Sequence, residues 1–188
     1  MDKTLKPTLW RTCRALANAR RLRILERLCT AGEQCVSQVA VACGVSVVQA
    51  TQHLRGLQAR GLLRVRRSSR WVFYTAAADP LVTQAAPALA AVRAAFARGD
   101  GVRDLQAAFT AFTHERRIRI ACALAAGPAD VAALRARTGI SAPALQRHLR
   151  KLRRRGVIDA DDRDRLRLAR LAPGLLRDVV RLALAEGA

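Results

Sequence analysis

Residues 46–63, SVVQATQHLRGLQARGLL, decide the fold because the chain repeats their pattern. A second version, SAPALQRHLRKLRRRGVI, occupies residues 141–158, 95 positions further along. The match continues upstream, where ALANARRLRILERL (15–28) lies over AFTHERRIRIACAL (111–124). Self-similarity on this scale indicates that one structural unit is used twice. We therefore expect each feature of the first unit to have a counterpart in the second.

The spacing inside the first unit predicts a helix-turn-helix. A short amphipathic helix ends at Gly44, and Ser46 is a suitable N-cap for the next helix. Ala50, Leu54 and Leu57 share one stripe of that helix. The side chains expected to point away from this stripe are Val48, Gln49, Gln52 and Arg55. In the second unit the inward set is Leu145, Leu149 and Leu152, and the outward set is Pro143, Ala144, Arg147 and Arg150.

A β-hairpin is predicted after each long helix, because a glycine is followed by two short apolar runs with a polar turn between them. The first hairpin, LLRVRRSSRWVFYTA, has a basic tip suited to touching phosphates, formed by Arg66, Arg67, Ser68, Ser69 and Arg70. The second, VIDADDRDRLRLARL, carries like charge that repels DNA, on Asp159, Asp161, Asp162 and Asp164. The expected fold is mainly α with small β-hairpin wings, in two tandem winged helix-turn-helix domains.

The charge balance indicates a polyanionic partner. The chain has 34 Lys and Arg against 14 Asp and Glu, a formal net charge of +20. Only 4% of the residues are aromatic, so there is little material for a platform that stacks single-stranded bases. Double-stranded DNA is the expected partner, and structured RNA is a more distant alternative.

Other function classes find little support in the sequence. There is no Gly-rich phosphate loop, no HExxH motif and no nucleophile elbow, so we expect no enzyme, no catalytic residue and no cofactor. The opening residues, MDKTLKPTLWRTCRALA, lack the apolar run of a signal peptide, and no window of eighteen apolar residues occurs. A cytoplasmic protein without a membrane partner is expected.

The five cysteines, Cys13, Cys29, Cys35, Cys43 and Cys122, are an odd number and lack CxxC spacing. We interpret them as reduced thiols, most simply as small buried hydrophobic residues. A thiol sensor is the alternative, because only a glycine-containing turn separates Cys29 from Cys35.

These motifs together resemble the winged-helix repressors of the arsenic- and metal-responsive ArsR/SmtB type. The resemblance rests on ALANARRLRILERL, on SVVQATQHLRGLQARGLL and on RWVFYTA, and it covers residues 9–76 well and 105–158 moderately. It implies binding of DNA by the long helix and the wing. The family's metal sites are not intact, because its Cys-x-Cys pair reads Cys35-Val36-Ser37 here, and PLVTQAAPALAAVRAAFA has no Asp, His or Glu. No metal is expected.

In the resembled family, the last helix pairs with the first helix of the unit in dimer contacts. The counterparts here are residues 80–97 and 173–186, so a chain with two units can fold as a covalent pseudo-dimer with two reading heads. The domains expected are an N-terminal winged helix (1–78), a linking helix (79–101) and a C-terminal winged helix with a terminal helix (102–188). The alternative to a monomeric pseudo-dimer is a homodimer of such chains.

The predicted function is a sequence-specific transcriptional regulator, most simply a repressor that occupies a promoter. An architectural, replication or plasmid-maintenance protein with paired winged helices is the alternative. The residues predicted to bind DNA are Ser46, Val48, Gln49, Gln52, His53, Arg55, Arg66, Arg67, Arg70, Ser141, Arg147, His148, Arg150, Lys151 and Arg154.

Overall fold

The computed structural model describes residues 8–187. The first seven residues of the predicted N-terminal domain, 1–78, and Ala188 of the predicted C-terminal domain lie outside the described residues. The first half of the chain forms α1 (Leu9–Leu16), α2 (Ala19–Ala31), β1 (Gln34–Cys35), α3 (Val36–Cys43), α4 (Val47–Gln58), β2 (Arg64–Ser68), β3 (Trp71–Thr75) and α5 (Ala85–Ala97).

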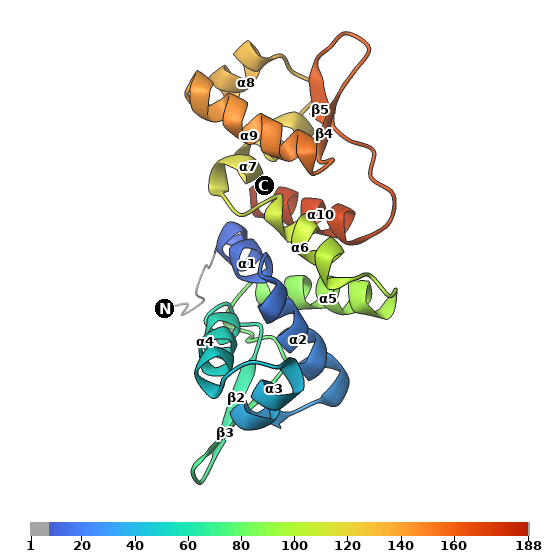
Figure 1. Ribbon diagram of the computed structural model, residues 1–188. Helices are drawn as coiled ribbons and strands as arrows, with labels where there is room; N and C mark the ends of the chain where they lie inside the picture. Colours follow the sequence, from blue (N-terminus) through green and yellow to red (C-terminus); the bar gives the residue numbers. More distant parts are fainter. Residues whose placement is uncertain (1–7, 188) are drawn as a thin grey trace.

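The second half has nearly the same order of elements. It forms α6 (Val102–Thr110), α7 (Glu115–Ala125), α8 (Val131–Thr138), α9 (Ala142–Arg154), β4 (Ile158–Ala160), β5 (Leu166–Leu168) and α10 (Leu175–Gly187). Figure 1 shows the α3–α4 helix pair with its hairpin at one end of the molecule and the α8–α9 pair with its hairpin at the other. The middle of the molecule is made of α1, α5, α6 and α10.

The predicted turn between the two helices is present in both halves. Gly44 follows α3 with φ +61°, and Gly139 follows α8 with φ +65°, a left-handed backbone that favours glycine. Ser46 caps α4 as predicted, since its hydroxyl accepts a hydrogen bond from the backbone N–H of Gln49 at 3.2 Å. Ser141 holds the same place before α9 without such a bond.

Each hairpin gains a partner that the sequence pattern did not predict. In the first half β1 pairs antiparallel with β3, so that the strand order is β1-β3-β2 and Cys35 lies opposite Phe73. In the second half β4 and β5 pair with each other, and a single bridge joins Ala129 to Leu166. These added segments are one or two residues long, too short for an alternating pattern to be visible. They tie the start of α3 and of α8 to the wing.

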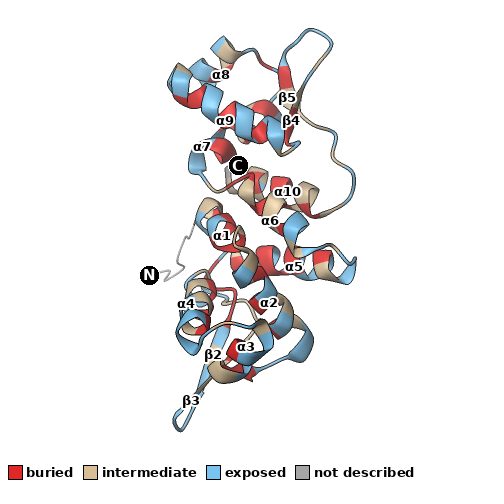
Figure 2. Ribbon diagram, in the orientation of Figure 1, coloured by how far each residue is buried: buried red, intermediate tan, exposed pale blue. Residues whose placement is uncertain are grey.

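The two halves share one hydrophobic core. α6 packs against α1 and α2, and α10 packs against α5, α6 and α7. Figure 2 shows buried positions on the four central helices. The fully buried side chains of this layer include Leu9, Leu16, Val92, Leu105, Phe109, Phe112 and Val179. The helices expected over 80–97 and 173–186 begin later, at Ala85 and Leu175, because residues on the N-terminal side of each form turns.

Candidate nucleic-acid interface

α4 presents a mixed apolar and amide face to solvent. Its predicted inward residues Ala50, Leu54 and Leu57 are fully buried. On the other side lie exposed Val48, Gln52 and Arg55. Val47, which was not predicted, is exposed too, at the first position of the helix. A major groove admits an α-helix, and valine methyls are suited to contact with thymine.

Gln49 has a structural task on this helix. Its side-chain oxygen accepts a hydrogen bond from the backbone N–H of Ser46 at 3.3 Å, while Ser46 caps the helix in return. Gln49 points outward as predicted but is held at the helix start, so Gln52 is the unrestrained amide of this face. His53 is half-buried, and its pKa is lowered by burial and by the neighbouring Arg21 and Arg20.

The first wing holds its arginines in two different ways. Arg67 and Arg70 are exposed near the turn, where Ser69 has φ +52°. Arg66 lies further down the hairpin and forms a bidentate ion pair with Glu33, with Nε 3.1 Å from Oε1. The guanidinium also lies 4.6 Å from the centre of the Phe73 ring. The predicted position of Arg66 at a free tip is therefore wrong, because Glu33 neutralises it and fixes it beside β3.

α9 presents a strongly basic face. Its inward residues Leu145, Leu149 and Leu152 are buried as predicted, but Ala144 is buried too and does not point outward. The exposed basic residues on this helix are Arg147, Arg150, Lys151, Arg153 and Arg154. None of the salt bridges formed within residues 8–187 includes them. Five uncompensated positive charges on one short helix make a surface that attracts phosphates.

His148 lies inside the second half. Its side chain is 5% exposed, and its ring stands 4.6 Å from the ring of His114, the N-cap residue of α7. Burial, followed by the neighbouring His114 and Arg117, lowers the pKa of His148 to about 4, so the ring is neutral at pH 7. The prediction that His148 contacts DNA is therefore wrong, because helix packing covers the ring.

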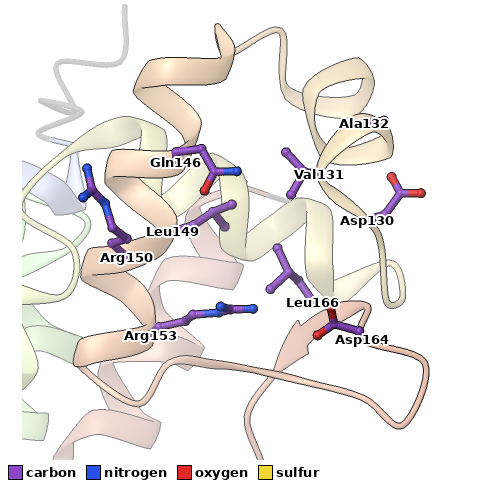
Figure 3. Close-up of a pocket in the computed structure, with 9 residues that line it drawn as sticks. All are labelled: Asp130, Val131, Ala132, Gln146, Leu149, Arg150, Arg153, Asp164 and Leu166. Atoms are coloured by element: carbon purple, nitrogen blue, oxygen red, sulfur yellow. The ribbon is translucent and has the colours of Figure 1, made fainter.

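The second hairpin is shorter and its acidic residues are partly paired. Asp159 accepts a hydrogen bond from Arg167 at 2.7 Å, and Asp161 from Arg165 at 3.0 Å. A cleft of about 500 Å³ separates this hairpin from α8 and α9. In Figure 3, Arg153 extends across the cleft toward Leu166 and Asp164, whereas Arg150 points away from them. Arg150 and Arg153 of α9 therefore point in different directions.

The thiols have separate environments. Cys29 lies on α2, and burial raises its pKa while the nearby Arg93 of α5 lowers it. At Cys35 burial also raises the pKa, but hydrogen bonds from Ser37 and from backbone N–H groups at the start of α3 outweigh it, so the pKa is below its ordinary value. All five cysteines are free. Cys13 is buried near Arg117 and Glu186 of the second half rather than in a cluster within the first unit.

Comparison with known proteins assigns part of this surface to a family. Residues 114–160 match the family model for bacterial regulatory proteins of the arsR family. This ArsR-family helix-turn-helix domain extends from the start of α7 through α8 and α9 to the end of β4. The family that matches this segment is one of regulatory proteins. The sequence analysis found the better resemblance in residues 9–76, whereas the family match falls on the second half.

One relative carries the same kind of name. The chain is 38% identical over 69 residues to the HTH-type transcriptional regulator Rv0324 of Mycobacterium tuberculosis. The matched segment covers 37% of this chain and 30% of the relative's own length. No solved structure matches the chain.

The described residues show neither a metal-binding cluster nor a membrane-spanning helix. Among residues 8–187, no three or more His, Cys, Asp or Glu side chains gather closely enough to hold a metal ion. Within the same residues no helix combines the length and apolar character that a bilayer span needs.

The sequence analysis missed Val47, Arg153 and the Glu33–Arg66 pair. Arg153 lies one turn after Arg150 on α9, so helical spacing would have found it. Val47 lies one turn before the buried Ala50, so helical spacing predicts an inward position, and its exposure comes from its place at the start of α4. Glu33 and Arg66 are 33 residues apart, and no local pattern connects them.

Proposed function

We propose that this chain is a DNA-binding transcriptional regulator in which α4 and α9 serve as two recognition helices of one covalent pseudo-dimer. The observation that carries the proposal is the central layer, where α1 contacts α6 and α5 contacts α10 within one chain. By the resemblance to ArsR/SmtB repressors, these are the helices that join two separate protomers. The proposed domains are 1–78, 79–101 and 102–188, and the proposed mode of action is repression by occupying a promoter.

The electrostatics of the chain support DNA as the partner. A net charge of +20 favours a polyanion, and phosphate neutralisation contributes sequence-independent affinity that falls as salt rises. The proposed backbone contacts come from residues outside the recognition faces and from the basic side of α9. They are Arg67, Arg70, Lys151, Arg153 and Arg154.

The two recognition faces differ in chemistry, which supports an imperfectly palindromic operator. α4 offers valine methyls and the amide of Gln52, which suit thymine and adenine. α9 offers Arg147 and Arg150, which suit guanine or phosphate. Each unit then prefers its own half-site, and the two half-sites lie about one helical turn, roughly 34 Å, apart.

A binding selection on duplexes with both half-sites randomised tests this function. We expect Gln52→Ala to relax base preference in one half-site only and Arg147→Ala in the other, each at a cost of about 1–3 kcal/mol if the contact is to a base. Gln58→Ala, an exposed amide at the end of the same helix α4, is a matched control with no effect expected on preference. Equal loss in both half-sites for either variant contradicts the assignment of one unit to each half.

A thiol response is proposed as the regulatory input in the first unit. Support comes from the lowered pKa of Cys35 at the start of α3, because the thiolate is the reactive form. DNA release by a mild oxidant is compared for the unmodified chain, Cys35→Ser and Cys29→Ser. Unchanged release in both variants removes the proposal without affecting DNA binding itself.

A further inference from the structure

A cleft beside α1 is rich in positive charge. Its volume is about 370 Å³, and it lies between α1, the start of α2 and the end of α4. It is lined by four arginines together with an indole and small residues: Trp10, Arg11, Arg14, Ala15, Arg21, Gly56, Ala59 and Arg60. No carboxylate is among these lining residues, so the cleft gathers positive charge without an internal counter-charge.

The arginines of this cleft have no acidic partners elsewhere in the described part of the chain. The salt bridges within residues 8–187 all involve other arginines. Arg21 donates through Nη1 to the backbone oxygen of Ala15 at 3.3 Å, while its buried Nε has no hydrogen-bond partner among the same residues. A buried N–H donor left unpaired carries a desolvation cost that a bound acceptor relieves. The cleft therefore has the uncompensated positive charge of an anion site, and one of its arginines carries an unpaired N–H.

The packing around Arg21 places its guanidinium close to α4. A Cβ at Gly56 would lie 3.2 Å from Arg21 Nε, a tight contact, so the guanidinium lies close against this helix. One turn earlier on α4, the pKa of His53 is lowered first by burial and then by Arg21 and Arg20, with no acidic group among the causes. This second observation indicates a positive potential at the same place.

The second half contains a matching cleft in which acidic residues accompany the arginines. A cleft beside α6 is lined by Arg154 and Arg155 at the end of α9, but Asp100 and Asp104 face it as well. Arg60 and Arg155 occupy matching positions, each directly before a glycine with φ close to +68°. The clefts that contain Arg23 or Arg153 likewise include a carboxylate. The two units therefore carry matching clefts, and of these two only the first has arginines without a carboxylate in its lining.

We propose that the cleft formed by Arg11, Arg14, Arg21 and Arg60 binds a phosphate group. Arginine recognises phosphate through several parallel N–H donors, and four guanidiniums in one cleft exceed what a carboxylate-sized anion needs. The phosphate has two sources, the DNA backbone between the half-sites or a free phosphorylated small molecule. The DNA source rests on the proposed function, whereas the phosphate site itself does not.

Tryptophan fluorescence reads the site directly. The chain contains two tryptophans, Trp10 in the cleft and Trp71 on the first wing, so Trp71→Phe leaves Trp10 as the only indole. In this background the full chain is titrated with pyrophosphate, and with sodium chloride at matched ionic strength. We expect a saturable change in Trp10 emission with pyrophosphate alone, and at least tenfold weaker binding after Arg14→Gln with Arg60→Gln.

A charge-matched control separates a site from general attraction. Arg103→Gln with Arg181→Gln removes the same charge from exposed positions on α6 and α10, and we expect it to leave pyrophosphate binding unchanged. Equal weakening in the cleft and control variants, or an equal response to chloride and pyrophosphate, overturns the proposal. Because no DNA is present, this result stands apart from the success or failure of the proposed regulatory function.

Adding duplex DNA identifies the source of the phosphate. If the backbone fills the cleft, DNA abolishes the pyrophosphate response. In the cleft variant, the log–log salt slope of DNA binding then falls by about 0.9 for each lost phosphate contact. If a small molecule fills it, the response persists in the DNA complex and the salt slope equals that of the control. Either outcome supports the site and names its occupant.

Discussion

Gly61 and Gly156 follow the two recognition helices at matching positions, with φ +68° and +67°, but their surroundings differ. A Cβ on Gly61 would lie 2.6 Å from the Cβ of Val82, whereas nothing lies within 4 Å of one on Gly156. At either position, the left-handed backbone costs alanine about 1–2 kcal/mol of folding free energy. We predict that Gly61→Ala lowers the free energy of unfolding more than Gly156→Ala does, as measured by urea denaturation. Equal losses would mean that Val82 moves aside freely.

His148 predicts a dependence of stability on pH. Its pKa in the folded chain, about 4, lies below the ordinary value of 6.5. Between these values the unfolded chain binds a proton that the folded chain does not, so stability falls as pH drops from about 6.5 toward 4. We expect the free energy of unfolding to fall less between pH 7 and pH 5 in His148→Leu than in the unmodified chain. The same fall in both would place the titrating group elsewhere.

Among the elements, the first wing combines a free cation with a neutralised one. Arg67 is exposed without an acidic partner in the described residues, whereas Arg66 is paired with Glu33. We predict that Arg67→Ala weakens binding to all duplex sequences alike, because a wing meets the backbone. Arg66→Ala should change affinity less, since the pair it breaks carries little net charge. Gel-shift titrations of both variants on specific and random duplexes measure this, and a larger loss for Arg66→Ala counts against the arrangement.

The elements also differ in how well they could be predicted from the sequence. The Gly44–Ser46 turn and the buried stripe of α4 could be predicted because each is set by residues close together in the sequence. The repeat could be predicted because the same pattern recurs 95 positions further along. The burial of His148 could not, because its partner His114 lies on another helix. The acid that holds Arg66 is likewise distant in sequence, and the bridge from Ala129 to Leu166 is a single pair. Features made by tertiary packing leave no periodic signal.

At the scale of the whole molecule, the central layer joins the two halves through packing and hydrogen bonds. The side chain of Glu186 in α10 accepts a hydrogen bond from the backbone N–H of Leu9 at 2.7 Å, at the start of α1. The amide of Gln106 in α6 donates to the backbone oxygen of Ala17 at 3.4 Å, just after α1. Phe109 and Phe112 are fully buried in the same region. Such a shared core fixes the two recognition helices relative to one another.

The central claim is that one chain supplies both recognition helices. The most direct test is the mass of the saturated complex on a duplex that carries both selected half-sites, measured by native mass spectrometry or sedimentation. The account predicts one chain per duplex, with a footprint over two successive major grooves. Two chains on that duplex, one at each half-site, would contradict it.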